Sequence, residues 1–165
     1  MEKGIIMNYS IYVDGAATMR KKGDVYTRCA GGHAFVVYNN SIKIYEYSNG
    51  SSSSTNNEQE LTAIYEALKW LKENPEFDGF SEATIYSDSA YCVNIFNNWI
   101  KAWIANNWTR GKKREAIENL SLIQEIHKLL TEMINVKIMK VKGHADCAGN
   151  NRADQLAVAA KNKFQ

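Results

Sequence analysis

The sequence predicts an α/β domain in which a mixed β-sheet is flanked by helices. Segments with the composition of strands come first and then alternate with amphipathic helical segments, in the order βββαβααβα. No segment repeats along the chain. The 165 residues fit a single domain, and a domain of this size buries roughly 70% of the surface that its unfolded chain exposes.

Three strands are expected in the first third of the chain. They are rich in β-branched and aromatic residues and cover 9–13, 33–38 and 42–47. The turn signal Asp14-Gly15 ends the first strand, and the polar stretch 39–41 favours an antiparallel hairpin between the other two. The stretch 49–57, Asn-Gly-Ser-Ser-Ser-Ser-Thr-Asn-Asn, has the composition of a linker, so we expect a mobile surface loop there.

The rest of the chain alternates between helix and strand. In the clearest helix, 57–73, leucine and isoleucine recur at helical spacing, and Pro75 closes it. The segment 99–114 is rich in tryptophan and basic residues. The other expected elements are a strand at 84–87, helices at 89–98 and 116–133, a strand at 136–141 and a final helix at 150–163.

Composition indicates a soluble protein. Hydrophobic residues make up 45% and charged residues 23%, and the net charge of +2 alone does not favour a nucleic-acid partner. The cysteines Cys29, Cys92 and Cys147 lack C-x-x-C spacing and are typical of reduced thiols. No apolar run is long enough for a membrane span or a signal peptide, so we expect a cytoplasmic monomer without membrane contact.

Four acidic residues stand where a stability argument would not place them. Asp14 and Asp88 each follow a predicted strand, at the sheet edge where α/β proteins build their sites. Glu60 shares a helix face with apolar residues, where a carboxylate is costly unless a cation or strong donor meets it. Asp154 lies in line with small apolar residues of the last helix. Taken singly, Asp14 is explained by a turn and Asp154 by a helix N-terminus.

The four carboxylates together indicate a metal centre. Carboxylates at one sheet edge repel each other unless a divalent cation neutralises them. Hard oxygen ligands around open positions suit Mg²⁺, with Mn²⁺ as the alternative. Such a cluster matches the two-metal arrangement used for in-line phosphoryl displacement, which predicts two Mg²⁺ ions when substrate is bound.

The segments around these acids resemble type 1 ribonuclease H, in the family's order and over about residues 9–161. The matching blocks are Tyr12-Val13-Asp14-Gly15, Thr55-Asn56-Asn57-x-x-Glu60-Leu61, Tyr86-Ser87-Asp88-Ser89, Val141-Lys142-Gly143-His144-Ala145 and Asn150-x-x-x-Asp154-x-Leu156-Ala157. The resemblance implies a ribonuclease H-like mixed five-stranded sheet flanked by helices, with residues 1–165 as one catalytic domain.

The resemblance also implies an activity. The family cuts the RNA strand of an RNA/DNA hybrid and leaves 5′-phosphate and 3′-hydroxyl ends. One metal ion would activate the attacking water and the other would stabilise the leaving 3′ oxygen. Its metal ligands carry over to Asp14, Glu60, Asp88 and Asp154, and its loop histidine, which assists chemistry or product departure, to His144.

A substrate surface is implied as well. By resemblance, Thr55 and Asn119 line a pocket for a phosphate of the DNA strand. Asn56 and Asn57 would contact the minor groove, where 2′-hydroxyls distinguish RNA from DNA. Thr55-x-x-Glu58 also fits a helix capping box, and the two interpretations are compatible because a helix N-terminus attracts anions.

The basic segment 99–114 resembles the protrusion with which cellular members grip the DNA strand. Its cations are Lys101, Arg110, Lys112, Lys113 and Arg114, and no acid lies among them. Cations near phosphates give salt-sensitive affinity, and an aromatic such as Trp99 can stack on sugar or base. The alternative is a solvated charged face over core tryptophans, which we favour for Trp103.

Two departures from the family's pattern and three rival functions are open. The long loop after Asp14 lacks a proline- and glycine-rich run, and Ser53 falls where many relatives have an arginine, which predicts a weaker phosphate pocket. The four acids argue against a silent hybrid-binding domain. A proofreading exonuclease would need an acid where Ala16 stands. A transposase-type nuclease stays an alternative on fold grounds.

Overall fold

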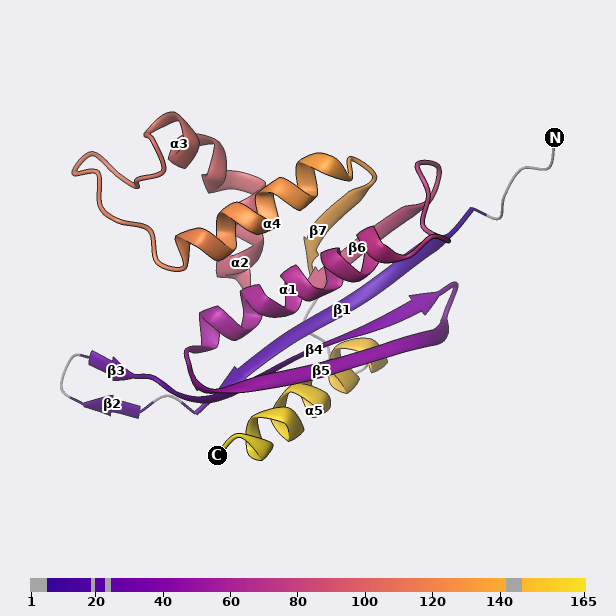
Figure 1. Ribbon diagram of the computed structural model, residues 1–165, viewed down its shortest axis with the longest axis horizontal. Helices are drawn as coiled ribbons and strands as arrows, with labels where there is room; N and C mark the ends of the chain where they lie inside the picture. Colours follow the sequence, from indigo (N-terminus) through magenta and orange to yellow (C-terminus); the bar gives the residue numbers. More distant parts are fainter. Residues whose placement is uncertain (1–5, 19, 23–24, 142–146) are drawn as a thin grey trace.

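The computed structural model describes residues 6–18, 20–22, 25–141 and 147–165. Five strands form the main sheet in the order β5-β4-β1-β6-β7 (Figure 1). The strands are β1 (Asn8–Ala17), β4 (Cys29–Asn39), β5 (Ile42–Ser54), β6 (Glu82–Ser87) and β7 (Val136–Lys140). The central strand β1 pairs antiparallel with β4 and parallel with β6, so the predicted mixed five-stranded sheet is confirmed.

Helices cover both faces of this sheet. Helices α1 and α4 lie over one face, and α5 packs across β4 and β1 on the other (Figure 1). The helices are α1 (Asn56–Glu73), α2 (Ala90–Asn94), α3 (Ile100–Ala105), α4 (Leu120–Glu132) and α5 (Ala148–Lys163). A π-helical turn, Ile95–Trp99, joins α2 to α3. Among the described helices, none is long and apolar enough to cross a membrane.

Helix α1 forms as its sequence predicts. Thr55 is the N-cap, and its hydroxyl accepts a hydrogen bond from the Glu58 N–H at 3.1 Å. The predicted apolar stripe of α1 is fully buried against the sheet and α4. The stripe consists of Leu61, Ile64, Leu68 and Leu71. Helix periodicity is a local property, which explains why the sequence predicted this element to within one residue.

The prediction of a mobile surface loop at 49–57 is wrong. Strand β5 runs through this stretch to Ser54, and α1 begins two residues later. Its partner β4 also begins earlier than predicted, and the two strands pair from Cys29↔Ser54 onward. Pairing with a long neighbouring strand therefore outweighs the linker-like composition, because strand formation depends strongly on context.

Strand β1 also differs from the expectation, since it does not end at Asp14. It continues to Ala17 in antiparallel pairing with β4. The parallel pairing with β6 does end there, at Val13↔Ser87. A small hairpin, β2 (Arg20–Lys22) and β3 (Val25–Thr27), occupies part of the segment expected to be a loop.

The helix expected at 116–133 begins later, at Leu120. Asn119, directly before it, has a left-handed backbone with φ of 58°. A non-glycine residue in this conformation interrupts a right-handed helix. The preceding residues therefore form an irregular connection, in which Ile117 alone is buried.

Gly15 brings α1 directly against β1. A Cβ atom at this position would lie 2.3 Å from the Glu60 nitrogen and 2.5 Å from the Gln59 carbonyl carbon. Both are backbone atoms of a helix and cannot rotate aside. The close approach of β1 and α1 therefore depends on the absence of a side chain at this glycine.

Gly15→Ala is expected to lower the free energy of unfolding by about 1–3 kcal/mol, the usual cost of overpacking. Urea unfolding of the metal-free protein, followed by circular dichroism, measures this change. Gly79→Ala is the matched control, because a Cβ there would meet nothing within 4 Å. Equal stability of the two variants would contradict the close packing of α1 on β1.

Candidate active site

Three carboxylates meet at the edge of the sheet where β1 and β6 stop pairing. Asp14, Glu60 and Asp88 each offer an oxygen, and these atoms all lie within 4.8 Å of one another. The register Val13↔Ser87 places the following residues, Asp14 and Asp88, side by side. Glu60 lies on the second turn of α1, which packs closely on β1 because Gly15 has no side chain.

Asp154, on the exposed side of α5, lies at the border of this cluster. The nearby Asp154 carboxyl raises the pKa of Asp14, and its charge raises the pKa of Asp88. The structure thus brings the fourth predicted acid close to the other three, from the opposite face of the sheet.

Burial and mutual repulsion perturb these acids. Asp14 is only 4% exposed, and burial, followed by the charge of Asp88, raises its pKa to about 7. Burial and then the charge of Asp14 raise the pKa of Glu60 well above its ordinary value. The pKa of Asp88 is raised by burial first and by Asp154 second. The cluster consequently favours any added positive charge.

The donor set fits a divalent cation. All the converging ligands are carboxylate oxygens, which Mg²⁺ and Mn²⁺ prefer. In addition, Glu60 Oε2 is buried and has no hydrogen-bond partner in the described part of the chain. A buried carboxylate oxygen without a donor is costly, and a metal ion would satisfy it.

The predicted histidine His144 belongs to residues 142–146, which lie outside the described residues. In the sequence they lie between β7 and α5, and α5 carries Asp154. The role assigned to His144 therefore stays a prediction.

The predicted minor-groove residues lie at the start of α1. Asn56 is anchored to the end of β1, because its Oδ1 accepts a hydrogen bond from the Ala17 N–H at 2.7 Å. Asn57 lines a small cavity of about 130 Å³ together with Arg110 and Trp103. The structure thus brings together two predicted substrate residues, Asn57 and Arg110, that are distant in the sequence.

The basic segment forms a projecting hairpin beyond α3. Arg110 and Glu115 exchange two backbone hydrogen bonds of 2.9 Å, which closes the turn. Lys112, Lys113 and Arg114 are exposed on this turn. It is therefore solvated and free to approach a polyanion.

The tryptophans of this segment divide between core and surface. Trp103 is 8% exposed and belongs to the core, as expected, whereas Trp99 is 38% exposed. Their ring centroids lie 6.0 Å apart. Both line an open cavity of about 570 Å³, which Lys112 and Arg114 also border. Trp99 thus offers an aromatic surface beside basic side chains.

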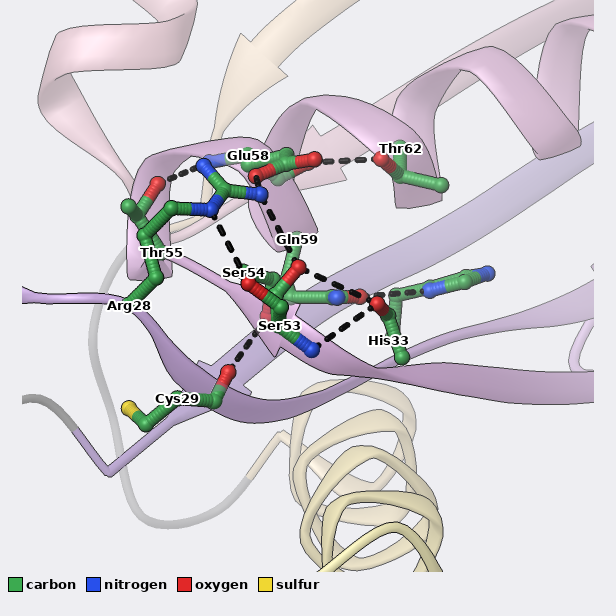
Figure 2. Close-up of polar contacts among 10 residues, drawn as sticks. Arg28, Cys29, His33, Ser53, Ser54, Thr55, Glu58, Gln59 and Thr62 are labelled. Carbon is green, nitrogen blue, oxygen red and sulfur yellow. Dashed lines mark hydrogen bonds and ion pairs between the residues drawn. The ribbon is translucent and has the colours of Figure 1, made fainter.

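Arg28, which no sequence pattern singles out, lies beside Ser53, and the weaker phosphate pocket expected there stays a prediction. Arg28 Nε donates to Ser53 Oγ at 3.1 Å, and its Nη2 donates to the Ser53 carbonyl at 2.9 Å (Figure 2). The guanidinium also forms an ion pair with Glu58 at 2.8 Å. A cation therefore does lie beside position 53, supplied by the segment before β4. Only the strand pairing, which no local pattern encodes, could reveal it.

A mixed five-stranded sheet with three carboxylates clustered at the edge where β1 and β6 stop pairing defines an α/β protein whose site suits a divalent cation. The RNase H family model matches residues 7–162. Ribonuclease H of Chlorobium phaeovibrioides is 40% identical over 154 residues, which cover 88% of this chain and 99% of that protein. Ribonuclease H of Acetivibrio thermocellus is 42% identical over 149 residues, 90% of each chain. The chain belongs to the ribonuclease H family.

Solved structures agree with this fold. LC9-RNase H1, described as a type 1 RNase H, is 23% identical with a TM-score of 0.76, over 99% of this chain and 76% of that one. LC11-RNase H1, solved in complex with an RNA/DNA hybrid, is 20% identical with a TM-score of 0.67, over 94% and 97% of the two chains. At these identities the likeness shows the fold.

The raised pKa of Asp14 predicts how the stability of the metal-free protein depends on pH. The folded chain keeps a proton on Asp14 up to about pH 7, whereas the unfolded chain releases it near the ordinary value of about 4. The folded state therefore binds more protons across this window, and the free energy of unfolding falls as pH rises through it. The fall should reach a few kcal/mol, at up to about 1.4 kcal/mol per pH unit.

Urea unfolding in a chelator, between about pH 5 and pH 8, measures this change. Asp14→Asn is the control, because it removes this titrating group and leaves Glu60, Asp88 and His33 to titrate. The variant should show a shallower fall than the parent protein. Identical pH profiles would contradict the raised pKa of Asp14.

Proposed function

We propose that this protein hydrolyses the RNA strand of RNA/DNA hybrids with Mg²⁺ and leaves 5′-phosphate and 3′-hydroxyl ends. The observation that carries the proposal is the convergence of the Asp14, Glu60 and Asp88 carboxylates, with a buried and unpartnered Glu60 oxygen, in a chain of the ribonuclease H family. The complex of LC11-RNase H1 with an RNA/DNA hybrid supports the substrate class.

Asp14, Glu60, Asp88 and Asp154 hold the metal in this proposal. Two Mg²⁺ ions, bound together with substrate, supply an activated water and charge stabilisation at the leaving 3′ oxygen. The Gly15 N–H, which donates to Asp14 Oδ1 at 2.9 Å, orients the central carboxylate. Protons held by Asp14 and Glu60 leave as the carboxylates become ligands, so metal binding should release protons. Mn²⁺ is the alternative cofactor.

His144 assists the reaction without holding metal. Its imidazole takes up a proton during the chemistry or eases the departure of the cleaved product. General acid–base help of this kind contributes on the order of 10²-fold in rate.

The substrate lies across the start of α1 and the basic hairpin. Asn56 and Asn57 read the minor groove, where the 2′-hydroxyls identify the RNA strand. Thr55 and Asn119 bind a phosphate of the DNA strand. Trp99 stacks against the hybrid, while Arg110, Lys112, Lys113 and Arg114 contact DNA phosphates.

Glu60→Gln should reduce hybrid cleavage by at least about 1,000-fold, because loss of the metal forfeits several kcal/mol of transition-state stabilisation. Glu73→Gln, an exposed glutamate at the end of the same helix, is the matched control and should cut normally. The assay compares a labelled RNA/DNA hybrid, a DNA duplex and single-stranded RNA, with and without Mg²⁺. Cleavage without Mg²⁺, or equal cleavage of all three substrates, would refute the proposed function.

Changing Lys112, Lys113 and Arg114 together to Ala should weaken hybrid binding and flatten its salt dependence. Each lost phosphate contact should lower the log–log slope by about 0.9, because fewer counterions are released. Turnover at saturating substrate should stay unchanged, since none of these residues belongs to the carboxylate cluster.

The control for this triple variant removes the same charge from the exposed Lys69, Lys128 and Lys137, on α1, α4 and β7. Binding should follow the hairpin charges and not the total charge. If both triple variants change the salt slope equally, the hairpin has no specific part in binding.

A further inference from the structure

We infer that His33 and Gln59 form a positioning pair that fixes how Glu60 meets Asp14 in the metal centre. Neither side chain belongs to the carboxylate cluster. The inference rests on the proposed metal-dependent function. It concerns how this chain builds its metal centre and gives roles to two residues that the sequence analysis did not select.

The pair joins the sheet to α1 through one buried hydrogen bond. His33 Nδ1 on β4 and Gln59 Oε1 on α1 are 2.6 Å apart (Figure 2). The two residues are only 6% and 3% exposed. Since an amide oxygen can only accept, Nδ1 carries the hydrogen and donates it, which leaves Nε2 without a proton in the neutral ring. Burial lowers the pKa of His33 and keeps the ring neutral.

The side chain of Gln59 crosses the sheet over two glycines. Its Cβ lies 2.9 Å from the point where a Cβ of Gly15 would stand. Its Cγ lies 2.7 Å from the corresponding point of Gly31, on the next strand. The amide then ends at His33, whose partner in the β1–β4 register is Gly15. Gln59 is thus held from below by the glycines and at its end by the imidazole.

Fixing Gln59 also fixes Glu60. The two residues are consecutive on a helix, so their side-chain directions are locked at about 100° to each other. The Glu60 nitrogen lies 2.3 Å from the point where a Cβ of Gly15 would stand. The N–H of Gly15 in turn donates a hydrogen bond to Asp14 Oδ1, and its influence lowers the pKa of Glu60, against the larger effect of burial. A small shift of the first turns of α1 would therefore change the spacing of the two carboxylates directly.

Stability alone does not explain a polar pair at this place. An aromatic ring lies beside the pair, since the ring of Tyr47 is centred 6.0 Å from that of His33. Furthermore, His33 Nε2 is buried and finds no partner among the described residues. Replacing both partners of a buried hydrogen bond by apolar groups of the same shape is nearly neutral for stability. The pair instead fixes the orientation of the Gln59 side chain, because a hydrogen bond favours one geometry whereas apolar groups pack in several.

Measuring both Mg²⁺ affinity and thermal stability distinguishes a role in positioning Glu60 from a role in folding. His33→Phe, Gln59→Met and the double variant are titrated with Mg²⁺ without substrate, following the NMR signals of the Gly15 and Asp88 amides. Each should bind Mg²⁺ about 10-fold more weakly, as when groups that orient a metal ligand are lost. The double variant should nevertheless recover the thermal stability of the parent protein, because no buried partner is left unsatisfied. Parental Mg²⁺ affinity in the double variant would overturn the inference.

His33→Asn supplies the conservative variant, since its side-chain amide nitrogen can replace Nδ1 as the donor. It should keep the parental Mg²⁺ affinity even though the lost ring lowers its melting temperature. Mg²⁺ binding as weak as that of His33→Phe would assign the effect to ring packing and overturn the pair. Asp14→Asn tests the metal centre itself. If its amides still titrate as in the parent protein, the proposed function fails, and this inference fails with it.

Discussion

The repulsion among three carboxylates held within 4.8 Å of one another is the constraint on which the structure depends. Left to themselves, Asp14, Glu60 and Asp88 would move apart or stay protonated, and their raised pKa values reflect this cost. A chain that keeps such groups together needs a rigid frame around them. Local destabilisation of this kind is expected where a site is built for a ligand.

Two glycines of the sheet build this frame, because each lets the backbone of a helix pack directly on a strand. On one face, Gly15 admits the backbone of α1. On the other face, a Cβ at Gly32 would lie 2.2 Å from the Ala157 carbonyl oxygen, so α5 also rests directly on the sheet. Arg152 on α5 further holds Glu46 on β5 through two hydrogen bonds, of 2.5 and 3.2 Å. Asp154, two residues from Arg152, is thereby carried to the border of the cluster.

The parts of this frame that the sequence predicts are those that depend on near neighbours. The stripe of α1 and the four acids follow from periodicity and from motifs a few residues long. The extension of β5 to Ser54 does not, because it depends on pairing with β4 twenty-five residues earlier. The same pairing brings Arg28 beside Ser53. Likewise, the bond between His33 and Gln59 spans 26 positions and leaves no local signal.

The separation of charge along the chain follows from the same constraint. A lysine or arginine within the cluster would pair with the carboxylates and compete with the metal that the site is built to bind. Substrate binding nevertheless needs cations, because a nucleic-acid backbone is a polyanion. In the proposed function this need is met by Lys112, Lys113 and Arg114, which lie on the hairpin closed by Arg110 and Glu115 and not in the carboxylate cluster. The small net charge of +2 therefore hides a cluster of acids and an exposed basic hairpin that come from separate parts of the sequence.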